Sequence, residues 1–400
     1  MKILIVVVNY LPSTMSSAKL IYDLATELHR QGHEPIVLAP DNNLPDRIQV
    51  SQEDGITVVR VRSGKIKNAS KYIRTINEAM LSWTLWRKGK KFFYENPCDL
   101  IICYSPSIFF GALVRKLKKL YNCGSYLIMR DIFPQWALDM GLLKPGVIFN
   151  YFKRKELQNY DAADIIGIQS PGNFHYYNEN GLSKKYRLEV LYNWVTLSEE
   201  HVEFKNIRKR LSLEDKVVFF YGGNIGIAQD MDNIVRLAER LTGEPRAFFL
   251  LVGDGSEVDR LRKLISEKKL TNILLLDAVD QFEYLGMLSE FDIGLITLDQ
   301  KLKTHNFPGK MLGYMYNSMP ILASVNPDND LTVLFDTIQA GLVCINGEDD
   351  KLTEYALRLV QDAELRKELG YNSRRLLETT FSVGQAASQI LAHFSPKKAG

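Results

Sequence analysis

A lysine at the start of a predicted helix is the strongest candidate for binding a phosphate group. The segment Thr304-His-Asn-Phe-Pro-Gly-Lys310 precedes Met311 and Met315, whose spacing is helical. Pro308 suits the first turn of a helix, and the backbone amides of that turn attract anions. Lys310 adds a full positive charge, which serves well as a point charge for phosphate. The alternative interpretation is a surface helix with a solvated lysine.

A glycine pair is the second candidate. Gly222 and Gly223 follow the apolar run Val217–Tyr221, and Asn224 comes directly after them. Glycines let backbone amides approach a phosphate closely, and a following helix points its positive end at the anion. An ordinary tight turn between a strand and a helix explains the same pattern, so the pair alone is a weak signal.

The N-terminal half offers a carboxylate and two serines. Arg130 and Asp131 follow an apolar run, and Asp131 could orient an acceptor hydroxyl or act as a general base. A helix N-cap or a salt bridge with Arg130 are the alternatives for Asp131. Ser16 and Ser17 could cap a helix while their amides line a cleft, and simple capping is the favoured interpretation.

Neither a metal site nor a redox motif is indicated. No cluster of residues suggests zinc, and no paired acidic motif demands magnesium. The four cysteines lack metal-ligand or redox spacing, which is typical of reduced cytosolic thiols: Cys98, Cys103, Cys123 and Cys344. We therefore expect no bound metal.

The elements that position these residues alternate between strands and helices. The β-branched run Lys2–Val8, a helical pattern ending at Gly32 and the strand Glu34–Ala39 predict a parallel βαβ unit. Near Tyr192 the pattern starts afresh, so the sequence predicts an α/β protein with two successive doubly wound, Rossmann-like repeats. Further strands are expected at 57–62, 100–104, 126–129, 165–169, 187–191, 217–221, 247–252, 273–276, 293–297, 320–323 and 342–345.

Length and charge support two domains. We expect an N-terminal domain over 1–192 and a C-terminal domain over 193–381, with a last helix at about 382–400 packing back on the first domain. No segment reaches the ~18 apolar residues of a spanning helix, and the opening run reads as a buried strand, not a signal peptide. Residues 1–190 hold 26 Lys and Arg against 17 Asp and Glu, a net charge of +9, whereas residues 191–400 hold 24 against 30, a net of −6. Opposite signs indicate different partners for the two halves.

One stretch in the basic half mixes aromatic and cationic residues. Between Ser82 and Tyr94 it holds Trp83, Trp86, Arg87, Lys88, Lys90 and Lys91. Such a stretch can lie in a membrane interface, and Val147–Lys155 repeats the theme. An ordinary helix with both tryptophans in the core is the alternative. Our hypothesis is a cytoplasmic protein peripherally associated with the inner face of the cytoplasmic membrane.

Taken together, these segments resemble family-4-type glycosyltransferases of the two-domain GT-B fold. The resemblance spans nearly the whole chain, through "SSAKLIYDLATELHRQGHEPIVL", "YNW", "FFYGGNIGIAQ", "FFLLVGDGSEVDRLRKL", "THNFPGKMLGYMYNSMPILAS" and "FSVGQAASQIL". It implies two Rossmann-like domains that face each other across a cleft. Through "RDIFPQWALDMGLL" and "HNFPGKMLGYM", the chain is most similar to bacterial O-antigen and capsule transferases thought to use UDP-N-acetyl-L-fucosamine.

The resemblance also implies roles for individual residues. Asp131 would lie beside the reacting sugar, Gly223 and Asn224 beside the diphosphate, and Ala278 and Val279 near the base. The rest of the donor site would be formed by Gly222, His305, Asn306, Phe307, Pro308, Gly309 and Lys310, with Ser16, Ser17 and Arg130 in the cleft loops. The implied partners are a UDP-sugar and an undecaprenyl-diphosphate-linked saccharide, without cofactor, metal or nucleic acid.

The chain departs from the family pattern at four positions. The usual pair of glutamates falls on His305 and Gly313, and the usual arginine and lysine of the phosphate loop fall on Asn224 and Gln229. Lys310 is therefore the main candidate for stabilising the departing diphosphate.

Other functions remain open at this stage. A sugar-nucleotide epimerase can share the fold, although it needs acid–base pairs and only Asp131 and His305 are available. The missing glutamates and basic residues also permit a non-catalytic partner that binds a nucleotide sugar. A nicotinamide dehydrogenase is disfavoured, because no G-x-G-x-x-G follows the first strand.

Overall fold

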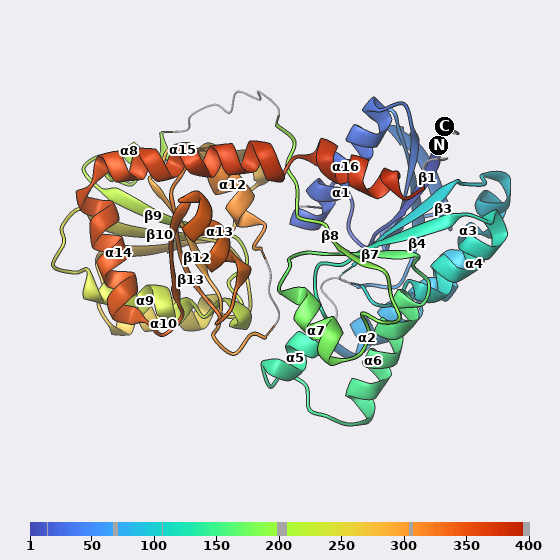
Figure 1. Cartoon of the computed structure of the whole chain (residues 1–400), viewed down its shortest axis with the longest axis horizontal. Helices are drawn as coiled ribbons and strands as arrows, with labels where there is room; N and C mark the ends of the chain where they lie inside the picture. Colours follow the sequence, from blue (N-terminus) through green and yellow to red (C-terminus); the bar gives the residue numbers. More distant parts are fainter. Residues whose placement is uncertain (14, 67–70, 106, 198–205, 304–306, 395–400) are drawn as a thin grey trace. The chain divides into compact units, whose positions relative to one another are not determined.

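The chain forms two compact α/β units in a computed structural model, which describes all residues except 14, 67–70, 106, 198–205, 304–306 and 395–400 (Figure 1). The N-terminal unit comprises Met1–Val195 with Val383–Gly400, and the C-terminal unit comprises Thr196–Ser382. Each unit is built around its own sheet, so the predicted α/β class with two Rossmann-like domains is confirmed.

The N-terminal sheet has eight strands in the order β3-β4-β2-β1-β5-β6-β7-β8. Every neighbouring pair is parallel except β3 with β4, which is antiparallel. The strands are β1 (Lys2–Val6), β2 (Glu34–Asp41), β3 (Ile48–Glu53), β4 (Ile56–Arg62), β5 (Leu100–Tyr104), β6 (Gly124–Ile128), β7 (Ile165–Ile168) and β8 (Leu188–Val190). The edge strand β3 was not predicted, because its sequence IQVSQE is mostly polar and lacks an apolar run.

Helices cover both faces of this sheet. Leu24 of α1 and Ile390 of α16 belong to the core on one face, while Leu85 of α3 and Leu117 of α4 belong to the core on the other. The helix at the end of the chain therefore packs on the N-terminal unit. The helices are α1 (Ser16–Arg30), α2 (Lys71–Ala79), α3 (Leu81–Glu95), α4 (Gly111–Tyr121), α5 (Gln135–Asp139), α6 (Val147–Tyr160), α7 (Asn173–Glu179) and α16 (Val383–Ala392).

The C-terminal sheet has six parallel strands in the order β11-β10-β9-β12-β13-β14. They are β9 (Val217–Gly222), β10 (Ala247–Val252), β11 (Ile273–Leu276), β12 (Ile293–Thr297), β13 (Ile321–Val325) and β14 (Gly341–Ile345). Numbered within the unit, this is the order 3-2-1-4-5-6, which reverses between β9 and β12. Doubly wound sheets bind ligands outside the carboxyl ends of the strands at such a reversal.

Neighbouring residues of the central strand β9 make ring contacts on opposite faces of the C-terminal sheet. Phe219 stacks on Phe249 at 4.8 Å, while its neighbour Phe220 turns to the opposite face and meets Tyr314 of α12. The helices are α8 (Ile207–Arg210), the 3₁₀ turn η1 (Ile227–Gln229), α9 (Met231–Arg240), α10 (Val258–Glu267), α11 (Gln281–Leu288), α12 (Lys310–Tyr316), α13 (Asp330–Ile338), α14 (Asp349–Gln361) and α15 (Ala363–Thr380).

Candidate functional site

Two glycine-containing loops meet backbone to backbone at the carboxyl ends of β9 and β10. Gly223 follows β9 with φ of 123°, a conformation that side chains rarely tolerate. A Cβ atom on Gly253 would lie 1.9 Å from the carbonyl oxygen of Gly223, and one on Gly255 would lie 2.2 Å from that of Ile225. Only glycine allows these loops to approach so closely. Gly253 and Gly255 were not among the predicted site residues, although both follow a predicted strand.

Hydrogen bonds hold the two loops in this position. The amide of Gly223 donates to the carbonyl of Val252 at 2.9 Å, and the amide of Ile225 donates to that of Asp254 at 2.8 Å. The backbone conformation of the β9 loop is therefore set by the β10 loop beside it.

Asn224 and Gln229 form a neutral pair within the β9 loop. Asn224 Nδ2 donates to Gln229 Oε1 at 2.9 Å, and the amide of Gly226 donates to the same oxygen at 3.1 Å. The two positions where the family resemblance places an arginine and a lysine thus fix the loop and bring no charge to it.

Lys310 brings a cation to the same loop. Its Nζ lies 3.2 Å from the centre of the Tyr221 ring, and a Cβ on Gly223 would be 3.8 Å from that nitrogen. Lys310 is half-buried, and loss of water around the ammonium group holds its pKa well below the usual value. Among the described residues it forms no ion pair with a carboxylate, so no carboxylate competes with an anionic ligand for this side chain.

Tyrosines join α12 to the β9 loop. The amide of Gly222 donates to Tyr314 Oη at 3.1 Å, and Tyr221 Oη donates to the carbonyl of Asn224 at 2.6 Å. Tyr314 is buried one turn beyond Lys310 on α12. These contacts explain why Lys310 and Gly223, far apart in sequence, lie together.

The other predicted donor residues lie directly before α12, after β11 or outside the described chain. Phe307 is buried with its ring 6.2 Å from that of Phe381, Pro308 is half-buried and Gly309 is exposed. Ala278 is exposed and Val279 half-buried after β11, the strand next to β10. His305 and Asn306 fall outside the described residues.

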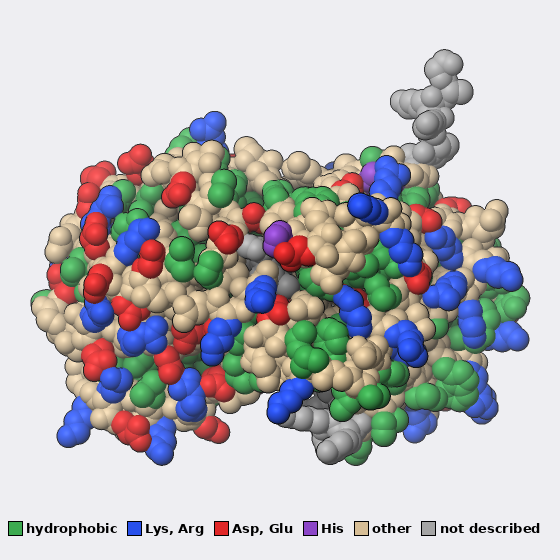
Figure 2. Space-filling view, turned by 60° about the horizontal axis from the view of Figure 1, so that its bottom comes forward, with side chains coloured by type: hydrophobic (Ala, Val, Ile, Leu, Met, Phe, Trp, Pro, Cys, Tyr) green, Lys and Arg blue, Asp and Glu red, His purple; other side chains and the backbone are tan. Residues whose placement is uncertain are grey.

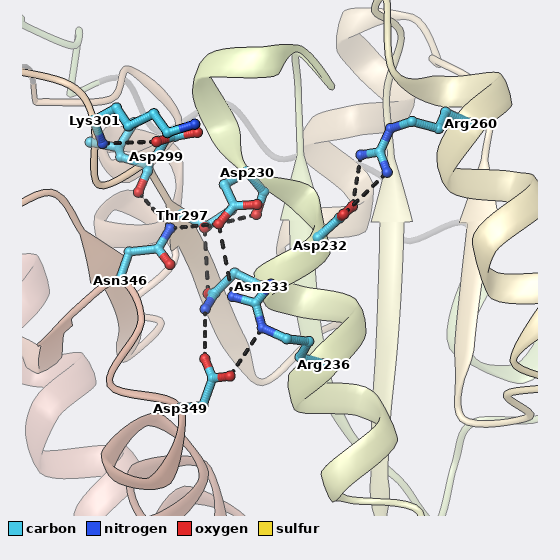
Figure 3. A network of polar contacts seen from close by, with 11 residues as sticks. Asp230, Asp232, Asn233, Arg236, Arg260, Thr297, Asp299, Lys301, Asn346 and Asp349 are labelled. Atoms are coloured by element: carbon cyan, nitrogen blue, oxygen red, sulfur yellow. Dashed lines mark hydrogen bonds and ion pairs between the residues drawn. The ribbon is translucent and has the colours of Figure 1, made fainter. Parts of the chain in front are cut away.

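A polar network ties the segment after β12 to the start of α9 (Figure 3). Asn346 Nδ2 donates to the carbonyl of Leu298 at 2.8 Å and to the carboxylate of Asp230 at 2.9 Å. Arg236 extends the network to Asp349, whose carboxylate lies 3.0 Å from Nε.

The same segment is held at two more points. The amide of Asp299 donates to the carbonyl of Ala228 at 2.9 Å, and buried Asn326 donates from Nδ2 to the carbonyl of Leu302 at 3.0 Å. The segment that leads towards α12 is therefore fixed to the 3₁₀ turn of the β9 loop. None of these positioning residues was predicted, because isolated asparagines carry no distinctive sequence signal.

In the N-terminal unit, neither structural alternative for Asp131 holds. Arg130 is buried and donates to the carbonyls of Leu191 at 2.7 Å and Tyr192 at 3.2 Å, and it forms no ion pair with Asp131, although the structure describes both. The helix α5 begins at Gln135, so Asp131 is not its N-cap. Burial raises the pKa of Asp131, and the Arg130 charge opposes that rise. A carboxyl group with a raised pKa is suited to accept a proton nearer to neutral pH.

Two other predictions for the N-terminal unit need correction. Ser16 and Ser17 do not cap α1, because the N-cap is Met15 and no side chain caps it; the Oγ of Ser17 lies 3.5 Å from Asn9 Nδ2. Trp86 is half-buried against the core and stacks on Phe93 at 6.1 Å, whereas Trp83 is half exposed. Of the two tryptophans predicted to lie in a membrane interface, Trp86 packs against the core and Trp83 is exposed.

Neither a metal-binding cluster nor a membrane-spanning helix occurs in the described part of the chain. Throughout the described ranges, no set of histidine, cysteine or acidic side chains is arranged to hold a metal ion. Within the same ranges, no helix combines the length and apolarity needed to cross a bilayer.

Comparisons with known proteins agree with this architecture. Residues 203–376 match the family described as glycosyl transferases group 1. The chain is 24% identical over 371 residues to WcaI of Escherichia coli (strain K12), named as a colanic acid biosynthesis glycosyl transferase, covering 87% of this chain and 89% of that protein.

Solved structures share the fold over the whole chain. Sucrose-phosphate synthase from Thermosynechococcus elongatus superposes with a TM-score of 0.75 at 15% identity, covering 98% of each chain. Anabaena Alr3699/HepE in complex with UDP gives a TM-score of 0.68 at 15% identity, covering 99% of this chain and 100% of the other. The fold is therefore GT-B, residues 203–376 form a glycosyl transferases group 1 domain, and the chain is a glycosyltransferase.

Proposed function

We propose that the enzyme transfers a sugar, with N-acetyl-L-fucosamine as the first candidate, from a UDP donor to a lipid-linked saccharide. The observation that carries the donor assignment is Lys310, a half-buried cation without a carboxylate partner in the described chain, placed against the glycine loop at the end of β9. A diphosphate supplies the negative charge that this position lacks.

In the proposed reaction, an acceptor hydroxyl oxygen forms a bond to the anomeric carbon as the bond from that carbon to the diphosphate oxygen breaks. The acceptor proton passes to Asp131, and UDP leaves with the bonding electrons. Lys310 and the backbone amides of the β9 loop stabilise the charge that develops on the leaving diphosphate. The neutral Asn224–Gln229 pair makes Lys310 the principal cation of this step.

A lipid-linked acceptor is supported by the similarity to WcaI and by the exposed residues of α3. WcaI is named for colanic acid biosynthesis, which agrees with a role in O-antigen or capsule assembly. An undecaprenyl-diphosphate-linked acceptor would require the enzyme to work at the inner face of the cytoplasmic membrane. The exposed Trp83 and the cations Arg87 and Lys90 of α3 are consistent with that location.

Incubation of the purified enzyme with a panel of UDP-sugars, first alone and then with the lipid-linked acceptor, tests the proposal. Transfer of sugar to the lipid with release of UDP is the expected result. An altered sugar in the absence of acceptor would identify an epimerase instead. Binding of UDP-sugar without any reaction would identify a non-catalytic binding protein.

A further inference from the structure

An apolar stripe along α2 and α3 is exposed to solvent. Ile73, Ile76, Met80 and Trp83 follow one another at spacings of three, four and three residues, which places them on one helical face. Their exposed fractions are 52%, 62%, 43% and 50%. An amphipathic helix of a globular domain normally turns such a stripe towards the core, and here it faces outwards.

The start of α6 carries a second exposed stripe. Val147, Ile148 and Tyr151 are 87%, 63% and 38% exposed. Lys155, one turn beyond Tyr151, lines the same pocket as Trp83 of α3 and Lys116 of α4. Trp83 of the first stripe and Lys155, one turn beyond the second stripe, therefore line one pocket between α3, α4 and α6.

A second pocket lies on the other side of Trp83. Its lining includes Arg47, Arg87 and Lys88 and contains no acidic residue. The guanidinium group of Arg87 lies 5.0 Å from the centre of the Trp83 ring, and Lys88 Nζ donates to the carbonyl of Arg62 at 2.6 Å.

The five cations of the two pockets lack carboxylate partners in the described part of the chain: Arg47, Arg87, Lys88, Lys116 and Lys155. The C-terminal unit differs, since Arg236, Arg240, Arg260 and Arg262 each pair with an aspartate. Figure 2 shows the same contrast, with acidic and basic side chains mixed over the C-terminal unit and mainly basic ones among the apolar patches of the N-terminal unit. Desolvation and the nearby arginines lower the pKa of Lys88, as expected for a cation among cations.

We propose that α2, α3 and α6 form a docking surface for an anionic lipid bilayer, with lipid phosphates bound in the two pockets that flank Trp83. The inference rests on the proposed membrane association and specifies its surface. The apolar stripes would enter the interface while the five cations contact headgroups. The surface adds α2 to the two predicted stretches, on α3 and at the start of α6, and omits Trp86, which packs against the core.

Charge complementarity favours a bilayer over a second protein. Cations at the edge of an exposed apolar stripe match an interface that is apolar inside and anionic outside. Arg87 over Trp83 places a cation and an aromatic ring together, an arrangement suited to the headgroup level of a membrane.

Co-sedimentation of the full chain with phosphatidylcholine vesicles, with and without phosphatidylglycerol, tests the surface. Binding to the anionic vesicles that weakens as salt rises is expected. The double substitution Arg47→Gln with Arg87→Gln should weaken it about thirtyfold, and Ile76→Glu should abolish it. Matched controls on the C-terminal unit, Lys209→Gln with Arg210→Gln and Val333→Glu, should bind as the wild type does.

Three results would overturn the inference. Equal binding of wild type and the Arg47/Arg87 variant would exclude the pockets, and equal binding to both kinds of vesicle would exclude headgroup phosphate. Self-association that Ile76→Glu abolishes, without vesicle binding, would reassign the surface to a second copy of the chain. UDP titration of the same variants should match the wild type, so a failure of donor binding remains distinguishable from a failure of docking.

Discussion

At the scale of single residues, Lys310 is an amino group whose charged form is disfavoured by burial. Burial lowers its pKa well below the usual value, so the unfolded chain binds more protons than the folded chain between the two pKa values. The contribution of this group to the free energy of unfolding is therefore largest above the usual lysine pKa. It is lost as the pH falls from that value to the lowered pKa of the folded state. A bound diphosphate favours the charged form and therefore raises the pKa again.

Replacement of Lys310 should change the free energy of unfolding and the affinity for UDP in opposite directions. We expect Lys310→Met to raise the free energy of unfolding at neutral pH and to weaken UDP binding about tenfold to a hundredfold, the worth of one charge-assisted hydrogen bond. Calorimetry in buffers of different ionisation enthalpy should detect proton uptake on UDP binding by the wild type and none by the variant. Lys209→Met, an exposed change, is the control. Identical UDP titration curves would remove Lys310 from the donor site.

Asp131 should control the acidic limb of the pH–rate profile. Its pKa is raised by burial, so the carboxylate form needed by a general base is lost as the pH falls through that raised value. Asp131→Asn should fold normally, lower transfer about 10²- to 10⁴-fold and remove the acidic limb. The exposed Asp46→Asn tests for a general effect of charge. Unchanged turnover by the Asp131 variant would reject the assigned role.

At the scale of elements, the contact between the β9 and β10 loops sets the backbone geometry of the proposed donor site. Gly253→Ala places a Cβ 1.9 Å from the carbonyl oxygen of Gly223, a backbone atom that cannot rotate away. We expect a loss of about 1–3 kcal/mol in the free energy of unfolding and weaker UDP binding, because Gly223 must move. Gly243→Ala is a matched control, since nothing lies within 4 Å of its Cβ. Denaturant unfolding and UDP titration measure both effects, and equal behaviour of the two variants would contradict the prediction.

Single elements also show what the sequence could predict. Apolar runs such as 217–221 and 247–252 correspond to observed strands, because fully buried parallel strands have continuous apolar sequences. The polar edge strand β3 lacks that signal and was missed. Capping of α1 was predicted from the serines, but the chain enters the helix one residue earlier, at Met15.

The candidate site could be predicted in its residue types but not in its contacts. The local sequence pattern predicted Gly223 and Lys310 as phosphate-binding residues. The resemblance to known transferases implied the same role for both. Their proximity depends on Tyr314 bonding to Gly222, a tertiary contact across 92 positions. The roles of Asn346 and Asn326 likewise depend on carbonyl groups that only the folded chain brings within reach.

At the scale of the whole molecule, the two units differ in their proposed functional residues and in their net charge. The glycine loops and Lys310 belong to the C-terminal unit, whereas Asp131 and the proposed membrane surface belong to the N-terminal unit. The halves 1–190 and 191–400 carry net charges of +9 and −6. A basic N-terminal unit suits an anionic surface, and an acidic remainder disfavours docking through the other unit.

The path of the chain makes a further prediction about the two units. After the C-terminal unit, α16 returns to the N-terminal unit, where Ile390 is fully buried in the core beside residues of α1. Ile390→Ala should cost about 2–5 kcal/mol in that core. Amide hydrogen exchange should therefore lose protection within 1–195, while protection within 196–382 and the affinity for UDP stay unchanged. The exposed Ser388→Ala on the same helix should alter neither. Equal loss of protection in both units would mean that they unfold as one cooperative body, and UDP affinity would then fall with the core of the N-terminal unit.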